Sequence, residues 1–296
     1  MCDISCGRRA TPMPNESLLP GGNVIRTKTA RITLACAITY ILTMGLANII
    51  IYHFSHVSYT DPSYTKALLP FLCLLAAGTL CCFFVLRKRL VPVHTGRRRY
   101  FLFLLLFLPM VGMTLYFWFT NGEPSSAFLI PIVVAFLVGT AEEMMFRRIL
   151  YVGLSRAPHG QDIRGALLVS ALMFSLLHSV NILAGFSLKN MLAQLVSTFI
   201  AGLFYALMYD YTKSILLIIA SHSLWDYLIE AAQRVPEFAI ITSALNLGEF
   251  IIMLVLLTRK WRQEKVATLQ TQTEPRGQQE PPNSSPGSGP VVASSS

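Results

Sequence analysis

Long apolar runs, separated by short polar or charged connections, divide the sequence into about eight segments. Their approximate bounds are 32–52, 67–86, 100–120, 128–151, 166–185, 191–209, 215–231 and 238–257. A helix rises about 1.5 Å per residue and the hydrocarbon core of a bilayer is about 30 Å thick, so a span needs roughly 20 apolar residues. The pattern therefore predicts an all-α, polytopic membrane bundle of about eight transmembrane helices.

Composition supports this fold class. Hydrophobic residues make up 53% of the chain, charged residues 13%, and the mean hydropathy is +0.54, which is far more apolar than a soluble domain. The formal net charge of +9 arises from Lys and Arg in short clusters beside the apolar runs, not from a basic stripe with interleaved aromatic residues. Nucleic acid is therefore not expected as a partner, whereas the lipid bilayer is.

Positive charge alternates between the two ends of the predicted spans. Clusters of Lys and Arg precede the first run, separate the second from the third and the fourth from the fifth, and follow the eighth. The clusters comprise Arg26, Lys28, Arg31, Arg87, Lys88, Arg89, Arg97, Arg98, Arg99, Arg148, Arg156, Arg164, Arg259, Lys260, Arg262 and Lys265. Cytoplasmic connections carry an excess of Lys and Arg, so we expect an integral, multi-pass membrane protein with both termini in the cytoplasm.

The two ends of the chain differ in composition from the apolar region. Residues 1–30 are expected to form a cytoplasmic tail, residues 31–262 the transmembrane domain, and residues 263–296 a disordered tail rich in Pro, Ser, Gly and Gln. The start of the chain lacks the pattern of a cleaved signal peptide. The six cysteines show neither zinc-ligand spacing nor the pattern of a disulfide framework.

Two adjacent carboxylates, Glu142 and Glu143, stand in the fourth apolar run. An ionisable residue inside an apolar span is costly and is by default a candidate functional group. Glu143 and Arg147 are four residues apart on a helix and can pair, and this pair alone could simply be structural. Glu142 has no partner at helical spacing, so it remains available to take a proton from water and to return it later.

Two later apolar runs contain groups that could work with Glu142. His178 lies in the fifth run, where a single histidine is about as often a packing residue as a catalytic one. His222 and Asp226 lie in the seventh run and share a helix face, so the carboxylate can orient the imidazole or both groups can reach one ligand. We expect these three segments to form one hydrolytic site inside the membrane.

The three segments can meet only at a particular depth. If the fourth span ended at Glu142, His178 would lie well toward the other side of the membrane. A fourth span over about 133–153 and a fifth over about 168–186 place Glu142, His178 and His222 near mid-membrane. This register buries Arg147, which requires Glu143 to neutralise it.

Three motifs in order resemble those of the CPBP family of intramembrane endopeptidases, also called the Abi or CAAX-protease family. The motifs are Glu142-Glu143-x-x-x-Arg147, Phe174-x-x-x-His178-x-x-Asn181 and His222-x-x-x-Asp226, within a core at about 126–230. The resemblance implies that Glu142 and His178 activate water, that His222 and Asp226 stabilise the oxyanion or orient the scissile carbonyl, and that Glu143, Arg147 and Asn181 support the site. The family often has Asn in place of Asp226, and an ionised Asp cannot donate a hydrogen bond to an oxyanion.

Two mechanisms fit these residues. In one, Glu142 deprotonates the attacking water without a metal ion. In the other, a divalent ion such as zinc, held by His178, His222 and a carboxylate, lowers the pKa of the water. No H-E-x-x-H motif is present, and we prefer the metal-free mechanism.

The substrate class is left open by the sequence. A membrane-buried site suits proteins or peptides held by a lipid anchor or a transmembrane helix, such as prenylated CAAX-like tails, C-terminal sorting helices or secreted peptide precursors. The competing class is not enzymatic: a membrane scaffold or immunity protein of the bacteriocin self-immunity type, or a proton-coupled carrier. Against a carrier, the two halves show no pair of interrupted helices at corresponding positions.

Overall fold

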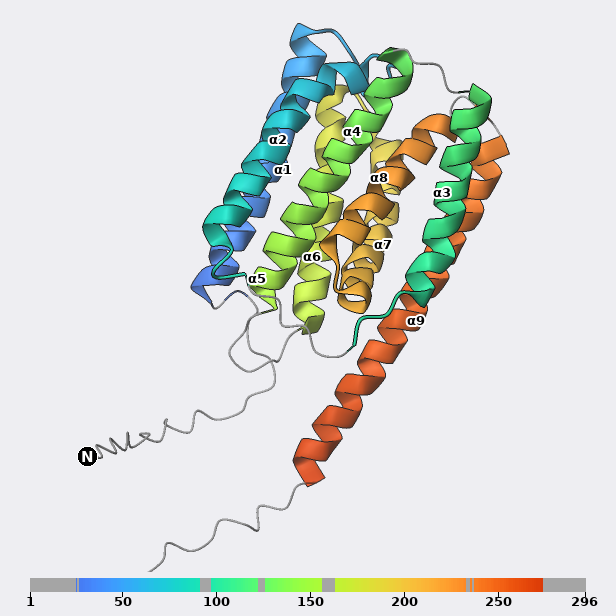
Figure 1. Cartoon of the computed structure of the whole chain (residues 1–296). Helices are drawn as coiled ribbons and strands as arrows, with labels where there is room; N and C mark the ends of the chain where they lie inside the picture. Colours follow the sequence, from blue (N-terminus) through green and yellow to red (C-terminus); the bar gives the residue numbers. More distant parts are fainter. Residues whose placement is uncertain are drawn as a thin grey trace, which may run out of the picture. The chain divides into compact units, whose positions relative to one another are not determined.

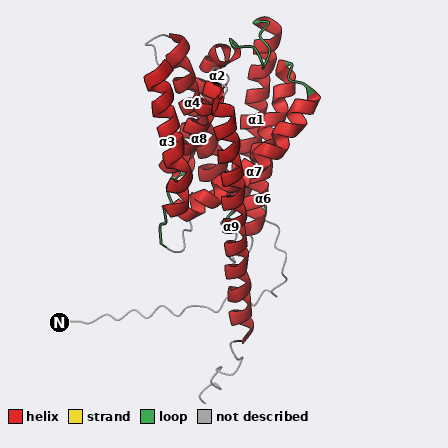
Figure 2. Cartoon of the chain, turned by 90° about the vertical axis from the view of Figure 1, so that its right-hand side faces the viewer, coloured by secondary structure: helices red, strands yellow, loops and turns green. Residues whose placement is uncertain are grey.

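The computed structural model of the protein describes residue 25 and residues 27–90, 97–121, 126–155, 163–232, 235 and 237–273. Within these residues every regular element is a helix (Figure 2). The α-helices are α1 (Lys28–Phe54), α2 (Tyr64–Leu86), α3 (Phe101–Asn121), α4 (Ser126–Glu143), α5 (Val152–Leu154), α6 (Ile163–Leu177), α7 (Leu188–Thr212), α8 (Ile215–Ala232) and α9 (Glu237–Thr273), as drawn in Figure 1. A π-helical segment, η1 (Met144–Tyr151), joins α4 to α5, and a 3₁₀ segment, η2 (His178–Ala184), follows α6.

Eight helical stretches in the described residues are long and apolar enough to cross a bilayer, which confirms the predicted fold class. The fourth of these stretches runs without a break over Leu129–Leu154, through α4, η1 and α5. It therefore passes both acidic residues and Arg147, as the depth argument required. The fifth covers Ile163–Ala184, through α6 and η2.

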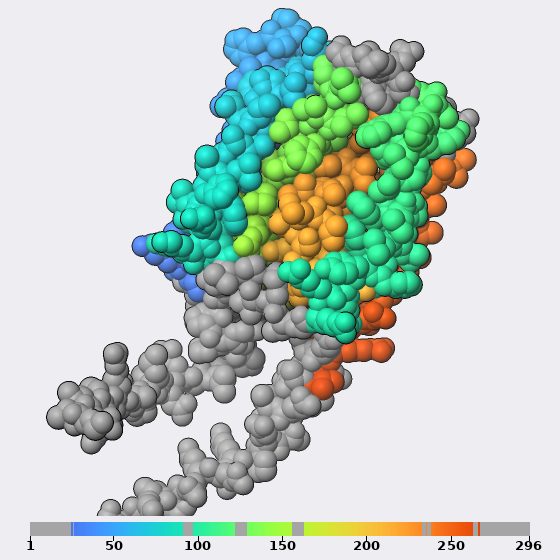
Figure 3. Space-filling view, in the orientation of Figure 1, coloured from blue at the N-terminus to red at the C-terminus, as the bar shows by residue number. Residues whose placement is uncertain are grey.

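Apolar side chains cover the outside of the bundle. In the space-filling view, α2, α4, α8 and α3 lie side by side across one face (Figure 3). Large apolar side chains are exposed on each of them, including Leu74, Phe136, Leu216 and Leu108. A soluble monomer rarely exposes so much contiguous apolar surface, whereas lipid tails cover it without cost.

A short connection returns the chain from η2 to α7. Gly185 ends η2 with a positive φ of 81°, a conformation that glycine adopts most easily. A Cβ at this position would lie 2.7 Å from Cε2 of Tyr52, so the Tyr52 ring would have to move to admit one. Ser187 then caps α7, because its hydroxyl accepts a hydrogen bond from the backbone N–H of Asn190 at 3.3 Å.

Close approach of α4 and α8 brings the motif residues of the two helices together. A Cβ on Gly139 would contact the hydroxyl of Ser223 and would lie 3.1 Å from the carbonyl oxygen of Ile219. The absent side chain thus lets the two backbones meet one turn before Glu142 and next to His222. Small residues allow such close helix contacts in membranes.

The wide π-helical segment begins directly after Glu143. A π-helix bonds each N–H to the carbonyl five residues earlier; it is rare and frequently occurs at functional sites. Its side chains are among the most buried of the chain, and Arg147, Phe146, Ile149 and Leu150 are each 0% exposed. The pattern of apolar residues predicted a helix here but not this local widening.

The chain divides into two compact units, Met1–Met253 and Leu254–Ser296. In the second unit, residues 254–273 continue the helix of α9, so residues 263–273 are helical although the sequence analysis placed them in a disordered tail. These eleven positions contain neither Gly nor Pro and include the good helix formers Gln, Glu, Lys, Ala and Leu. The remaining tail residues 274–296, and residues 1–24 at the other end, lie outside the described residues, so the predictions for them stand as predictions.

Candidate active site

A buried ion pair links α4 to the π-helical segment. The Glu143 Oε1 atom lies 3.0 Å from Nη1 of Arg147, and both side chains are 0% exposed. The guanidinium also lies over the ring of Phe174, 4.0 Å from its centroid, and 5.5 Å from the ring centroid of Tyr205. Aromatic faces attract cations, so one carboxylate and two rings surround this charge. The predicted pairing is present.

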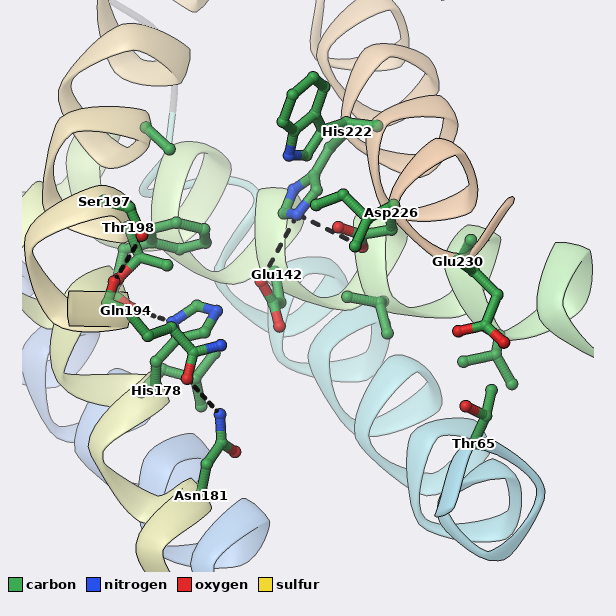
Figure 4. A pocket seen from close by; sticks show the side chains of 18 of the residues that line it. Thr65, Glu142, His178, Asn181, Gln194, Ser197, Thr198, His222, Asp226 and Glu230 are labelled. Carbon is green, nitrogen blue, oxygen red and sulfur yellow. Dashed lines mark hydrogen bonds and ion pairs between the residues drawn. The ribbon is translucent and has the colours of Figure 1, made fainter. Parts of the chain in front are cut away.

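His222 joins the second histidine motif to both glutamates. Its Nδ1 atom lies 2.6 Å from Glu143 Oε1, and because a carboxylate only accepts, the imidazole N–H donates. Its Nε2 atom lies 3.8 Å from Glu142 Oε2 and 3.5 Å from Asp226 Oδ2 (Figure 4). The ring stacks on Tyr205 at a centroid distance of 5.1 Å and an interplanar angle of 17°. Glu143 therefore contacts both Arg147 and His222, whereas the sequence predicted only its contact with Arg147.

Glu142 differs from its neighbour. It is 6% exposed, and its Oε2 atom, like Oε2 of Glu143, makes no hydrogen bond with any described residue. Glu142 lacks the short contacts that Oε1 of Glu143 makes with Arg147 and His222. Its nearest ionic neighbour is Nε2 of His222. A buried carboxylate oxygen without a hydrogen-bond donor is costly, so this atom is available to a water molecule or a substrate.

His178 stands at the point where α6 becomes the 3₁₀ segment. Its Nδ1 atom lies 3.1 Å from the carbonyl oxygen of Phe174, and since a carbonyl only accepts, Nδ1 carries the proton. The imidazole of His178 also packs edge-on against the Phe174 ring. In the neutral ring, Nε2 is then the acceptor.

Asn181 belongs to a chain of amide hydrogen bonds. Its Nδ2 donates to Oε1 of Gln194 at 3.0 Å, and its Oδ1 accepts from Nδ2 of Asn48 at 3.3 Å. Gln194 donates in turn to the hydroxyl of Tyr59 at 3.1 Å, and Asn48 accepts from Tyr64 at 2.6 Å. These bonds connect α1, α2, η2 and α7, and the partners of Asn181 were not identified from the sequence.

A cavity of about 400 Å³ brings the predicted residues together. Glu142, His178, Asn181, His222 and Asp226 all line it, and Figure 4 shows these side chains around a common space. Glu143 and Arg147 are not among the lining residues and lie behind the wall, in contact with His222, Phe174 and Tyr205. The cavity also reaches the connection between α1 and α2, where Tyr59 and Tyr64 line it.

Two further acidic residues line the cavity, Glu230 of α8 and Glu249 of α9. The sequence contained a signal for each. Glu230 continues the four-residue spacing of His222 and Asp226 along the same helix face. Glu249 is the only charged residue in the run 238–257, so the cost of an ionisable group inside an apolar span pointed to it as well.

The described ranges contain no group of three or more His, Cys, Asp or Glu side chains arranged to hold a metal ion. His222 faces carboxylates, whereas the Nδ1 atom of His178 is bonded to a backbone carbonyl. The zinc set of His178, His222 and a carboxylate therefore remains a prediction, and we assign no step to a metal ion.

The fold and the site together define a class: a multi-pass membrane protein with a buried Glu-His site in a cavity between its helices. Residues 124–228 match the family model described as type II CAAX prenyl endopeptidase Rce1-like. The match confirms the resemblance to the CPBP, or CAAX-protease, family, whose activity is that of a membrane protease and hence a hydrolase. No curated protein and no solved structure matched the chain.

Proposed function

We propose that the protein is an intramembrane endopeptidase that cleaves membrane-associated proteins or peptides with a water activated by Glu142. The observation that carries this proposal is the contrast between the two adjacent glutamates. Oε1 of Glu143 is held by Arg147 and His222, whereas Glu142 lines the cavity and lies 3.8 Å from its nearest ionic neighbour, Nε2 of His222. An ion pair with Arg147 that served only to stabilise the fold would need only one of these two carboxylates.

In the proposed reaction, Glu142 accepts a proton from water as the water oxygen attacks the scissile carbonyl carbon. The neutral His178 accepts a hydrogen bond from the same water at Nε2, because its Nδ1–H is bonded to Phe174. The tetrahedral intermediate then breaks its C–N bond as Glu142 passes the proton to the leaving nitrogen, which yields a carboxylic acid and an amine. Such general acid-base catalysis contributes roughly 10²–10⁴-fold to the rate.

His222 and Asp226 are assigned to the oxyanion. As an imidazolium, His222 donates Nδ1–H to Glu143 and presents Nε2–H to the cavity, where negative charge develops on the carbonyl oxygen. Asp226 cannot donate such a bond when ionised, and its Oδ2 lies 3.5 Å from Nε2 of His222. We therefore assign Asp226 to orienting the imidazole.

The test compares native membranes that contain the protein with membranes from which its gene is deleted. Mass spectrometry of the termini of membrane-associated proteins should reveal precursors that keep their uncleaved terminal segment only in the deletion strain. The uncut sequences would name the substrate class among prenylated tails, sorting helices and peptide precursors. Identical termini in the two membranes would instead favour a scaffold or immunity protein, and proton uptake by reconstituted vesicles would favour a carrier.

We further propose that the cavity is reached from the side of the membrane away from the cytoplasm. Its lining residues Tyr59, Tyr64 and Thr65 belong to the connection between α1 and α2 and to the start of α2. The basic cluster Arg87, Lys88 and Arg89 follows the other end of α2. Positive charge marks cytoplasmic connections, so the α1–α2 connection lies opposite the cytoplasm.

Labelling of single cysteines tests this orientation. In a chain whose own cysteines are replaced, cysteines introduced by Thr60→Cys and Lys88→Cys are treated with a membrane-impermeant maleimide. Both positions are exposed. In intact cells the Thr60→Cys protein should react and the Lys88→Cys protein should react only after permeabilisation. The reverse pattern would place the cavity entrance on the cytoplasmic side.

A further inference from the structure

We propose that Asp226, Glu230 and Glu249 form a subsite that binds a Lys or Arg side chain of the substrate. This inference rests on the proposed function, since it names a property of the peptide to be cleaved. All three carboxylates line the cavity that contains Glu142. Glu230 and Glu249 lie beyond residues 124–228, the segment matched by the family model. The subsite is therefore argued from this chain alone, and we call it the acidic wall.

Glu249 provides the main observation. Its side chain is 6% exposed and lines the cavity, in the middle of an apolar helix. Within the described residues it forms no hydrogen bond and no ion pair, and His222 is the titratable neighbour that acts on it electrostatically. A buried carboxylate without a partner is destabilising. A cation that enters the cavity from outside the chain would offset this cost.

The α8 helix adds the second observation. Asp226 and Glu230 are four residues apart, so they share one face of the helix, and Figure 4 shows both on the same side of the cavity. Like charges at this spacing repel each other and destabilise a helix. Asp226 contacts His222, but no ion pair to Glu230 is formed within the described part of the chain. A cation between α8 and α9 would relieve this repulsion.

The charges around the cavity determine the sign of the ligand. No Lys or Arg is among its described lining residues, and Arg147 lies behind the wall, where Glu143 and two aromatic rings hold it. Acidic side chains therefore outnumber Lys and Arg side chains on the described lining of the cavity. A cationic side chain with an apolar stem fits this wall, because Trp225 and Ile229 line it beside the carboxylates.

The opposite wall is polar but uncharged. Asn181, Gln194, Ser197 and Thr198 line it, and Figure 4 places them across the cavity from Asp226 and Glu230, with Glu142 between. This asymmetry gives the bound peptide a direction. The scissile bond lies at Glu142, and the basic residue of the substrate lies on the side of that bond that is nearer to α8 and α9.

The test uses the full-length protein in lipid nanodiscs and farnesylated CAAX peptides as probes. Each peptide carries one Lys at successive positions on either side of the scissile bond, and its partner carries norleucine there. The preference for Lys should appear at one position, on one side of the scissile bond. There the wild-type KM for the Lys peptide should be about tenfold lower than the KM for the norleucine peptide, as expected of a close charge pair. Glu249→Gln and Glu230→Gln should each reduce this ratio severalfold, whereas Asp61→Asn, which removes an acidic side chain outside the cavity, should retain it.

Binding separates this inference from the proposed function. The affinity of each peptide for the wild-type protein is also measured by fluorescence anisotropy. If no peptide is cleaved but the Lys peptides bind more tightly and lose this advantage in Glu249→Gln, the acidic wall stands and CAAX peptides are excluded as substrates. If the termini in native membranes are also unchanged on deletion of the gene, the endopeptidase proposal fails while the acidic wall stands. If Lys and norleucine peptides bind equally, or if the preference for Lys persists in both Gln variants, the acidic wall is refuted. Each ratio compares the Lys and norleucine peptides on the same variant. Partial misfolding of that variant affects both peptides equally and leaves the ratio unchanged.

Discussion

Replacing Glu142 with Gln is expected to lower peptide cleavage by about 10²–10⁴-fold while the protein folds normally. The amide has nearly the same shape as the carboxylate but cannot take a proton from water. The side chain lines the cavity and its Oε2 atom makes no hydrogen bond with any described residue, so little packing is lost. Initial rates on a substrate identified from native membranes, at matched membrane levels of the two proteins, measure the effect.

The control for this experiment is Asp61→Asn. Asp61 is an exposed acid in the α1–α2 connection whose carboxylate accepts hydrogen bonds from Ser63, and it does not line the cavity. This variant should retain wild-type activity. If the Glu142→Gln protein cleaves as fast as the wild type, or fully rescues a deletion strain, the hypothesis that Glu142 activates the attacking water is wrong. If activity is lost reversibly on treatment with a chelator, the metal-dependent mechanism replaces the metal-free one.

The sequence was sufficient to predict the membrane spans because each depends on a single local quantity, the length of an apolar run. A position of Glu142 near mid-membrane was also expected from the sequence, since a span that ended at Glu142 could not have brought it to His178. The described span Leu129–Leu154 agrees with that argument. The ion pair of Glu143 and Arg147 could be predicted for a similar reason, because it is formed within one helical turn.

Contacts between distant segments were predicted less well. The hydrogen bond from His222 to Glu143 joins residues 79 positions apart, and no spacing rule distinguishes Glu143 from Glu142 as the acceptor. The amide chain through Asn48, Asn181 and Gln194 depends on how four elements pack. The π-helical segment was missed because its apolar pattern is also that of an ordinary helix. Glu249 was missed because it lies in the last span, after the three motifs, and its position on the cavity depends on how distant helices pack.

The second large effect is expected from Arg147→Met, which should destabilise the bundle by about 3–5 kcal/mol. The substitution keeps an apolar side chain of similar length but removes one of the two ionic partners of the buried Glu143, so that His222 alone remains. It also removes the cation between Phe174 and Tyr205. Loss of helical circular dichroism on titration with a denaturing detergent, measured against the wild type in the same lipid mixture, reports the change.

The double variant Glu143→Gln with Arg147→Met distinguishes a lost ion pair from lost packing. It removes the charges of Glu143 and Arg147, yet the Gln oxygen can still accept the hydrogen bond from Nδ1–H of His222. Replacing both members of a buried pair is often close to neutral, whereas removing one leaves the other uncompensated. The double variant should therefore be more stable than Arg147→Met alone. If it is no more stable than Arg147→Met, the stability comes from the packing of the arginine between its two rings, and Glu143 serves chiefly to hold His222 beside Glu142.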